Sequence, residues 1–234
     1  MILYGRNPVR EALRGRRRVL RAWASADLDW LSGVELQRMD ADGIEELCGS
    51  PDHQGVCAEA ETYPYADPDG LLASEEALVV CLDQVQDPQN LGAVCRVAEA
   101  AGVAGVVIPE RRAVEVTPAV CKASAGAVEH LALARVRNLA DWLASAKQGG
   151  AWVYGATAEE GVPYDKPDWS GRAVLVLGSE GEGIRPRVAA ACDALVSLPM
   201  EGRIESLNVS SAAAALLYGI RLLRGRDLAN RPGG

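Results

Sequence analysis

Residues Leu195 to Tyr218 read LVSLPMEGRIESLNVSSAAAALLY, and this stretch decides the fold of the last third of the chain. A short apolar strand ends at Pro199, and a loop with three charged residues follows. An alanine-rich helix comes next. Ser206 and Asn208 are predicted to cap it, because their side-chain oxygens can accept hydrogen bonds from unpaired amides of the first turn. Taken alone, the pattern is typical of a capped core helix after a buried strand.

A second stretch combines a buried strand with glycines. The apolar run 173–177 predicts the strand, and GSEGEG at Gly178 to Gly183 follows it. Glycines let backbone approach a ligand closely. Glu180 and Glu182 would repel phosphate, and neither a Lys-Ser/Thr pair nor the dinucleotide spacing G-x-G-x-x-G is present. The bend therefore suits a neutral or cationic ligand, with a plain turn as the alternative.

A third stretch, DQVQDPQNLGAVCRVA, runs from Asp83 to Ala98 after an apolar strand. Asp-Pro at 87–88 breaks that strand, and Asn90 is predicted to cap a helix that continues to about Ala101. Arg96 lies less than two helical turns after Asn90, so both side chains can approach one end of the sheet. The alternative for Arg96 is a solvated arginine on an amphipathic helix.

The order of apolar runs predicts an α/β fold. From residue 77 onward strands alternate with helices, which indicates a mostly parallel sheet covered on both faces; the strand candidates are 77–82, 103–108, 131–136, 151–155, 173–177 and 194–198. The preceding residues predict a small α/β unit, with a helix capped by Asn7 and ended by Gly15, a strand at 19–24, a helix at 41–47 and a strand at 55–60. Residues 62–70 show few signals of regular structure and make the best linker.

Charge is distributed unevenly along the chain. The net charge is −8, yet residues 6–21 hold seven arginines and one acid, whereas residues 27–76 hold fourteen acids and one base. This split favours a concentrated basic face for phosphate, with a solvated charged helix as the alternative.

Composition excludes several other classes of protein. No apolar run reaches the ~20 residues that span a bilayer, and no signal-peptide core follows Met1, so we expect a cytoplasmic protein. The six cysteines lack C-x-x-C spacing and are expected to be buried free thiols. With only two histidines in the chain, we expect no metal site.

Taken in their order along the chain, the three stretches resemble the motifs of the SpoU/TrmH family, the 2'-O-ribose RNA methyltransferases of the SPOUT class. Asn90-x-Gly92-x-x-x-Arg96 looks like the first motif, LGSEGEG at 177–183 the second, and LPM through SLNVS at 198–210 the third. One departure is Val97, where the family usually has Ser or Thr.

The likeness extends to the beginning of the chain. YGRNPV at 4–9 and HQG at 53–55 look like the amino-terminal domain of the subgroup that methylates a guanosine of 23S ribosomal RNA. The resemblance implies an RNA substrate-binding domain similar to ribosomal protein L30e (1–61), a linker (62–75) and a methyltransferase domain (76–234) with a carboxy-terminal trefoil knot. It also implies a homodimer, in which the final helix, about Leu207 to Leu223, contributes to the contact.

The resemblance further implies S-adenosylmethionine as cofactor. Its binding residues would be Gly178, Leu198 and Leu207 through their backbone, with Thr157, Met200 and Ser206 nearby. Backbone groups can recognise adenine while Leu and Met flank its faces, so these residue types fit that ligand.

Arg96 is the activator that the family resemblance gives for the ribose hydroxyl. Because arginine stays protonated, we expect Arg96 to donate hydrogen bonds to the 2'-oxygen or the adjacent phosphate and to stabilise the developing alkoxide. Glu180 would hold Arg96, while Asn90, Ser206 and Asn208 would orient the substrate.

Phosphate contacts are expected from basic residues outside the motifs, namely Arg6, Arg10, Arg17, Arg18 and Lys122. Two other functions are open: the same chemistry on transfer RNA, and a non-catalytic RNA-binding factor for ribosome assembly or resistance. The intact motif residues argue against the second. For Trp23 and Trp30, core packing is favoured over stacking on bases, and His130 is expected to be structural.

Overall fold

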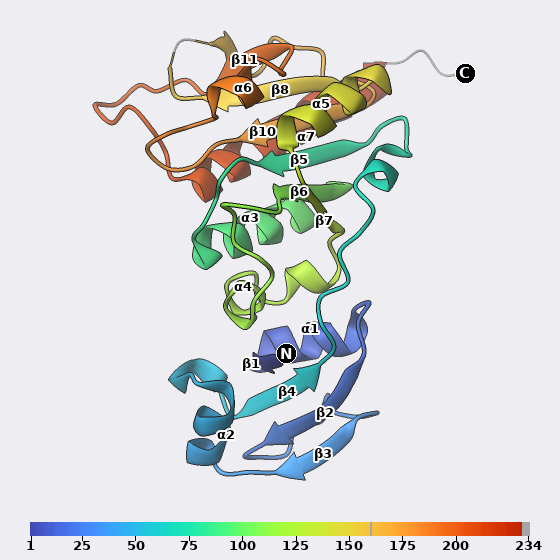
Figure 1. The fold of residues 1–234 in the computed structure, drawn as a ribbon, viewed down its shortest axis with the longest axis vertical. Helices are drawn as coiled ribbons and strands as arrows, with labels where there is room; N and C mark the ends of the chain where they lie inside the picture. The colour runs from blue at the N-terminus through green and yellow to red at the C-terminus, as the bar shows by residue number, and fades with distance from the viewer. Residues whose placement is uncertain (160, 231–234) are drawn as a thin grey trace. The chain divides into compact units, whose positions relative to one another are not determined.

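The computed structural model describes residues 1–159 and 161–230. Contacts divide the chain into two compact units. The first unit contains residues 1–64, 87–96 and 115–130, and the second contains residues 65–86, 97–114 and the chain from 131 onward. The strands in the described ranges form one four-stranded and one seven-stranded sheet (Figure 1).

The smaller sheet belongs to the first unit and has the strand order β1-β4-β2-β3. β4 pairs antiparallel with β1 and β2, and β2 pairs parallel with β3. The strands and helices within residues 1–64 are β1 (Ile2–Tyr4), α1 (Arg6–Arg14), β2 (Val19–Ala24), β3 (Glu35–Arg38), α2 (Ala41–Cys48), the short 3-10 helix η1 (Pro51–His53) and β4 (Val56–Ala60). The predicted strands at 19–24 and 55–60 are confirmed as β2 and β4.

Two strands of this sheet were not predicted. β1 has three residues, and β3 is exposed at all four positions, so neither shows an alternation of apolar and polar residues. The cap of α1 was also predicted wrongly: Gly5, not Asn7, precedes the helix, with a φ of 92° that disfavours other residues. Gly15 ends α1 as predicted.

The core of the first unit contains a buried ion pair. The Nε and one terminal nitrogen of Arg17 donate to the carboxylate oxygens of Glu129 at 2.9 and 2.5 Å, and both side chains are 1% exposed. The other terminal nitrogen donates to the Glu61 carbonyl at 3.3 Å. Burial lowers the pKa of the Arg17 guanidinium, but the hydrogen bonds and charge of Glu129 outweigh burial and hold this pKa above its ordinary value.

This pair corrects the prediction that Arg17 contacts RNA. A guanidinium that is enclosed by protein and bonded to Glu129 and Glu61 presents no donor to a phosphate. Arg17 is therefore a structural residue. Its neighbour Arg18 is exposed.

The larger sheet belongs to the second unit, and its neighbouring strands run parallel, which confirms the predicted α/β fold with a mostly parallel sheet. The strand order is β7-β6-β5-β10-β8-β11-β9. The strands are β5 (Leu78–Leu82), β6 (Gly105–Pro109), β7 (Leu133–Val136), β8 (Trp152–Thr157), β9 (Val162–Pro163), β10 (Ala173–Leu177) and β11 (Ala194–Ser197). β9 was not predicted, because two residues carry no periodic signal.

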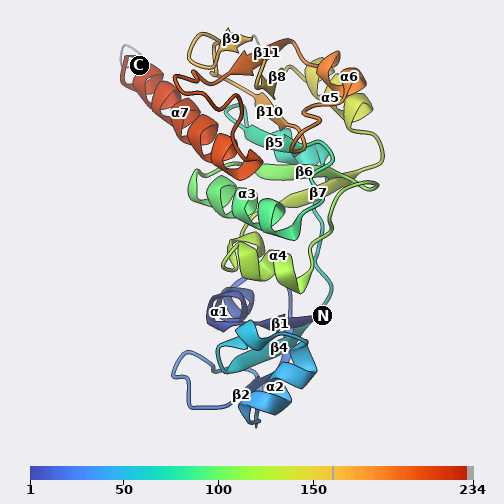
Figure 2. The ribbon, with the colours of Figure 1, turned by 90° about the vertical axis from the view of Figure 1, so that its left-hand side faces the viewer.

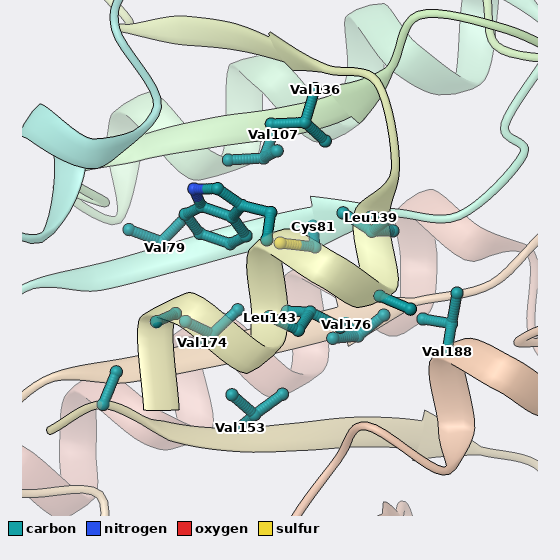
Figure 3. Close-up of a cluster of buried hydrophobic side chains, with 14 of the residues drawn as sticks. Val79, Cys81, Val107, Val136, Leu139, Leu143, Val153, Val174, Val176 and Val188 are labelled. Atoms are coloured by element: carbon teal, nitrogen blue, oxygen red, sulfur yellow. The ribbon is translucent and has the colours of Figure 1, made fainter. Parts of the chain in front are cut away.

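Helices cover both faces of this sheet. The remaining helices in the described residues are α3 (Pro88–Ala100), α5 (Leu139–Gln148), α6 (Pro186–Ala189) and α7 (Val209–Asn230), with the 3-10 helix η2 (Asp69–Leu72); α4 (Pro118–Ala123) and the 3-10 helix η3 (Ala127–Glu129) belong to the first unit. α5 and α6 pack on one face, and α7 lies on the opposite face (Figure 2). Figure 3 shows the core under α5, in which Leu139 and Leu143 of that helix meet the strand residues Val79, Val174 and Val176.

Two arginines fix α7 to the rest of the second unit. Arg221 donates to the carbonyls of Ala101 and Gly102, just after α3 ends. The distance from Arg221 Nη2 to the Gly102 carbonyl oxygen is 2.8 Å. Arg224 is buried and donates to the carbonyls of Glu76 and Gly171 at 2.7 and 3.0 Å. These bonds supply donors to carbonyls that lie outside the helix and strand ladders.

The predicted linker at 62–70 is ordered by tertiary contacts. Tyr63 is buried and its hydroxyl donates to the Val128 carbonyl at 3.0 Å. The Ala66 amide donates to the Leu133 carbonyl at 2.9 Å, so this residue extends the ladder next to β7. Local sequence shows neither contact, because the partners come from distant segments.

The cysteines are free thiols, as predicted. Cys57, Cys81, Cys95 and Cys121 are buried, and burial raises the pKa of Cys57 and of Cys121 to about 12. Thiols with such pKa values carry little thiolate at neutral pH and are poor nucleophiles. The other two, Cys48 and Cys192, are half-buried.

The ion pair of the first unit makes a prediction about stability. Glu129→Gln leaves the Arg17 guanidinium buried without a counter-charge, so the free energy of unfolding should fall by about 3–5 kcal/mol. Arg18→Gln changes an exposed neighbour and should stay within about 0.5 kcal/mol of the unchanged protein. Urea unfolding followed by circular dichroism measures both variants. Equal stabilities of the two variants would contradict the assignment of Arg17 to the core.

Candidate active site

A pocket of about 780 Å³ lies where β8, β10 and β11 end. These strands are neighbours in the sheet and run parallel, so their carboxyl ends meet at one edge. Ligands of open α/β sheets bind outside this edge. The volume falls within the ~300–1,000 Å³ that is usual for small-molecule sites. The pocket is lined by residues 156–159 at the end of β8, by 177–184 at the end of β10, and by residues from 195–200 and 205–209 around the end of β11 and the start of α7.

All six residues that the resemblance implies for the cofactor line this one pocket: Thr157, Gly178, Leu198, Met200, Ser206 and Leu207. They come from the last residue of β8 and from the segments that follow β10 and β11, and the sheet brings these together. Met200 and Leu207 are large apolar residues that stay exposed at 39% and 45%, so they offer apolar surface to a ligand.

The glycine-rich loop is a closed ring that only glycine permits at its base. A Cβ on Gly178 would lie 2.1 Å from the Gly183 carbonyl carbon and 2.4 Å from the Ile184 nitrogen. Ser179 and Gly183 exchange two backbone hydrogen bonds of 3.1 and 3.0 Å, which close the ring. The loop is thus a built wall of a pocket rather than a plain surface turn.

Asn208 joins the second and third motifs. Its side-chain oxygen accepts hydrogen bonds from the Ser210 amide at 2.8 Å and the Ser210 hydroxyl at 2.6 Å, so it caps α7 as predicted. Its side-chain nitrogen donates to the Glu180 carboxylate. Ser206, which was predicted to share the capping, precedes the helix by three positions and lines the pocket instead.

The residues of the first motif lie on α3. The helix begins at Pro88, and the Asp87 carboxylate accepts from the Gln89 amide at 2.9 Å. Asp87 therefore caps α3, and the prediction that Asn90 does so is wrong: Asn90 lies in the first turn. Arg96 is exposed, whereas Cys95 beside it is buried. The predicted contact between Arg96 and Glu180 stays a prediction.

Gly92 of the first motif serves the contact between α3 and α4. A Cβ there would lie 2.4 Å from the Cβ of Ala123 and 2.9 Å from the Ser124 amide. The glycine is needed because the two helices approach closely at this point.

The predicted RNA-binding residues have different surroundings. Arg6 and Arg18 are exposed, and the Arg10 guanidinium lies 5.0 Å from the centre of the Trp30 ring. The Lys122 ammonium donates to the Asp52 carbonyl at 2.7 Å and lies 5.9 Å from the centre of the Tyr4 ring. If Lys122 contacts a phosphate, its ammonium must bind the phosphate and the Asp52 carbonyl at the same time.

Three smaller predictions concern residues outside the motifs. Trp23 is buried against Ile44 and Cys57, which confirms core packing. The His130 Nε2 lies 2.8 Å from a carboxylate oxygen of Glu11, a contact that suits a structural residue. In the described parts of the chain, no three His, Cys, Asp or Glu side chains are grouped to hold a metal ion, and no helix has the length and apolarity to cross a bilayer.

Sequence reasoning missed part of the electrostatics of the pocket. Among the residues that the structure describes, four carboxylates line it: Glu159, Glu180, Glu182 and Glu205. They make the pocket negative, which favours a cationic ligand over a phosphate. The signal was present for Glu159 and Glu205, since both follow predicted strands, but nothing in the local pattern shows that those loops converge.

Comparison with known proteins gives a consistent result over most of the chain. The model of the SpoU rRNA Methylase family matches residues 77–218, and a model for RNA 2'-O ribose methyltransferase substrate binding matches residues 2–66. YacO of Bacillus subtilis, assigned to the TrmH family of tRNA/rRNA methyltransferases, is 37% identical over 230 residues, which is 92% of this chain and 92% of YacO.

Solved structures agree. The SpoU methyltransferase AviRb from Streptomyces viridochromogenes, in complex with AdoMet, is 27% identical, with a TM-score of 0.81 and coverage of 97% of this chain and 90% of AviRb. A protein assigned to the TrmH family from Porphyromonas gingivalis is 30% identical, with a TM-score of 0.79 and coverage of 94% and 89%.

The glycine ring makes a prediction that needs no ligand. Gly178→Ala places a Cβ against the backbone of Gly183 and forces the ring open, so the free energy of unfolding should fall by about 1–3 kcal/mol. Gly202→Ala is the matched control, because its Cβ would meet only the Ile204 nitrogen at 4.0 Å. Urea titration measures the free energy of unfolding of both variants. Equal stabilities of Gly178→Ala and Gly202→Ala would contradict the claim that a Cβ at position 178 disrupts the ring.

Proposed function

Because the chain belongs to the SpoU rRNA methylase family of RNA 2'-O-methyltransferases, we propose that it methylates the 2'-hydroxyl of a guanosine in 23S ribosomal RNA. The methyl donor is S-adenosylmethionine, which AviRb holds in its crystal structure. The observation that carries the proposal is the convergence of the six predicted cofactor residues on one pocket.

The residues of the pocket fit this cofactor. Backbone at Gly178, Leu198 and Leu207 can hydrogen-bond to adenine, and the apolar side chain of Met200 can cover a face of its ring. The carboxylates around the pocket suit a ligand with a sulfonium and an ammonium group. When bound, S-adenosylmethionine supplies a methyl group that is activated by the positive charge on sulfur.

Arg96 supplies the chemistry on the ribose side. It donates hydrogen bonds to the 2'-oxygen or the adjacent phosphate and stabilises negative charge as the hydroxyl loses its proton to water. Asn90, Ser206 and Asn208 orient the substrate. Glu180, which Asn208 binds, holds Arg96 in place. Alignment of the ribose with the activated methyl group provides the remaining part of the rate enhancement.

RNA is bound by the amino-terminal part of the chain, through Arg6, Arg10 and Arg18, with Lys122 as a further phosphate ligand. The match of residues 2–66 to a substrate-binding model supports this placement. The motifs at residues 4–9 and 53–55 favour 23S ribosomal RNA. Transfer RNA is the alternative substrate, because the name of the relative YacO covers both.

Three features of the molecule complete the proposal. The domains are an L30e-like domain at 1–61, a linker at 62–75 and a methyltransferase domain at 76–234, which carries a trefoil knot in its carboxy-terminal segment. The enzyme acts as a homodimer that uses α7. Tyr218 and Leu222 support this interface, since they lie one turn apart on α7 and stay 51% and 65% exposed.

Transfer of tritium from labelled S-adenosylmethionine tests the reaction and its substrate. Incubation with total ribosomal RNA and, separately, with transfer RNA should label the large ribosomal RNA, and nuclease digestion should place the label on a guanosine 2'-oxygen. Label in transfer RNA alone would favour the alternative substrate, and no transfer to either RNA would refute the enzyme assignment for these substrates.

Arg96→Ala should abolish this transfer while the Kd for S-adenosylmethionine, measured by calorimetry, stays nearly unchanged. Arg96→Lys keeps the charge but loses the planar fork of donors, so its turnover should fall steeply as well. Full activity of the lysine variant would contradict the role given to the guanidinium.

Arg18→Gln should weaken RNA binding and lower the salt dependence of log Kd by about one, because one phosphate contact is lost. Arg38→Gln is the matched control: it removes the same charge from an exposed arginine that pairs with Asp27. Filter binding at several salt concentrations measures both. The same loss in both variants would indicate a general effect of charge rather than a contact by Arg18.

A further inference from the structure

One wall of the pocket is a continuous segment, and an ion pair lies directly beyond its two ends. The wall comprises the eight residues from Leu177 to Ile184, all of which line the pocket. At its beginning, the Asp83 amide donates to the Leu177 carbonyl at 2.8 Å. At its end, Arg185 follows Ile184 directly. Neither Asp83 nor Arg185 lines the pocket.

Asp83 and Arg185 are joined by four hydrogen bonds. The Asp83 Oδ1 accepts from Nε and Nη2 of Arg185 at 2.9 and 2.6 Å, and the Oδ2 accepts from the Arg185 backbone nitrogen at 2.9 Å and from Nε at 3.2 Å. The backbone bond fixes the direction in which the chain leaves the loop, and the three side-chain bonds from Arg185 hold the Asp83 carboxylate in the position that accepts it.

Burying this ion pair costs desolvation free energy, so a role beyond stabilising the fold is expected for it. The Asp83 side chain is 0% exposed, and Arg185 is 39% exposed. A buried carboxylate is tolerated only with close hydrogen bonds to a counter-charge, and an apolar contact would stabilise the fold with less desolvation. What an apolar pair cannot do is set the orientation of a backbone amide.

Between its two ends the wall has contacts within the loop and one to Asn208, which donates to the Glu180 carboxylate. Gly181 and Gly183 have φ values of 88° and 65°, a region that glycine enters freely, and the ring is closed by the bonds between Ser179 and Gly183. With its base fixed by Asp83 at one end and Arg185 at the other, this glycine-rich segment is held as a pre-formed surface.

We propose that Asp83 and Arg185 are positioning residues that hold the wall 177–184 in the shape that binds the adenosyl part of the methyl donor. This inference rests on the proposed function. Both residues act through the backbone of the loop and touch neither the donor nor RNA. Their loss changes the affinity for the donor and leaves the chemical step, once donor is bound, unchanged.

Calorimetry with S-adenosylmethionine tests the inference. Arg185→Gln and Asp83→Asn should each raise the Kd by about tenfold, and the double variant should be no weaker than either single variant, because both remove the same coupling. Arg185→Lys, which keeps the charge but not the fork, should fall between. Arg187→Gln is the matched control: Arg187 lies two residues further on and makes an ion pair with Asp141 in which both side chains are largely exposed.

Steady-state methyl transfer separates positioning from a general loss of structure. The variants should raise the KM for S-adenosylmethionine, keep kcat at saturating donor within about twofold, and leave the KM for RNA unchanged. Unchanged donor affinity in Arg185→Gln, or equal losses for donor and RNA, would overturn the inference. If Arg185→Gln fails to fold, Arg185→Lys decides by the same criteria. Absence of donor binding in the unchanged protein would instead refute the proposed function.

Discussion

The parallel alignment of β10, β8 and β11 is the constraint on which the pocket depends. Parallel strands present their carboxyl ends at one edge, and here the register is set by side-by-side pairs such as Val176 with Gly155 and Val196 with Ala156. The residues that follow each strand therefore emerge at the same level of the sheet. Three segments that are separated along the chain become neighbours because of this register.

Polar contacts then shape what the strands bring together. Asn208 ties the start of α7 to Glu180 in the glycine loop, and the Asp83–Arg185 pair fixes the base of that loop. The apolar core beneath gives the sheet its rigidity, and the hydrogen bonds above it give the loops their shape. Valine and leucine therefore dominate the framework, whereas the site combines glycines and polar groups with a few exposed apolar residues such as Met200 and Leu207.

Much of this framework was predictable because it is local. β5 and β10 are buried at every position, so each appears in the sequence as an uninterrupted apolar run. Elements without a local signal were missed. β3 is exposed throughout and β9 has two residues, and only pairing with a neighbouring strand defines them. The trefoil knot and the homodimer came from resemblance and stay predictions.

The site was predictable to the extent that its motifs are contiguous. The six residues that the resemblance implies for the cofactor line one pocket, whereas the cap of α3 was assigned to Asn90 instead of Asp87. Arg17 shows the limit most clearly. Within the run Arg16-Arg17-Arg18 nothing distinguishes the middle residue, and its burial depends on Glu129, 112 positions away. A charge pattern predicts a basic segment but not which of its side chains face inward.

Hydrogen exchange with and without S-adenosylmethionine tests the central claim, that this pocket holds the methyl donor, most directly. Bound donor should slow amide exchange in peptides covering 177–184 and 198–209, and leave the strands of the amino-terminal sheet unchanged. Protection confined to segments outside the pocket, or none at a donor concentration that supports methyl transfer, would contradict the account.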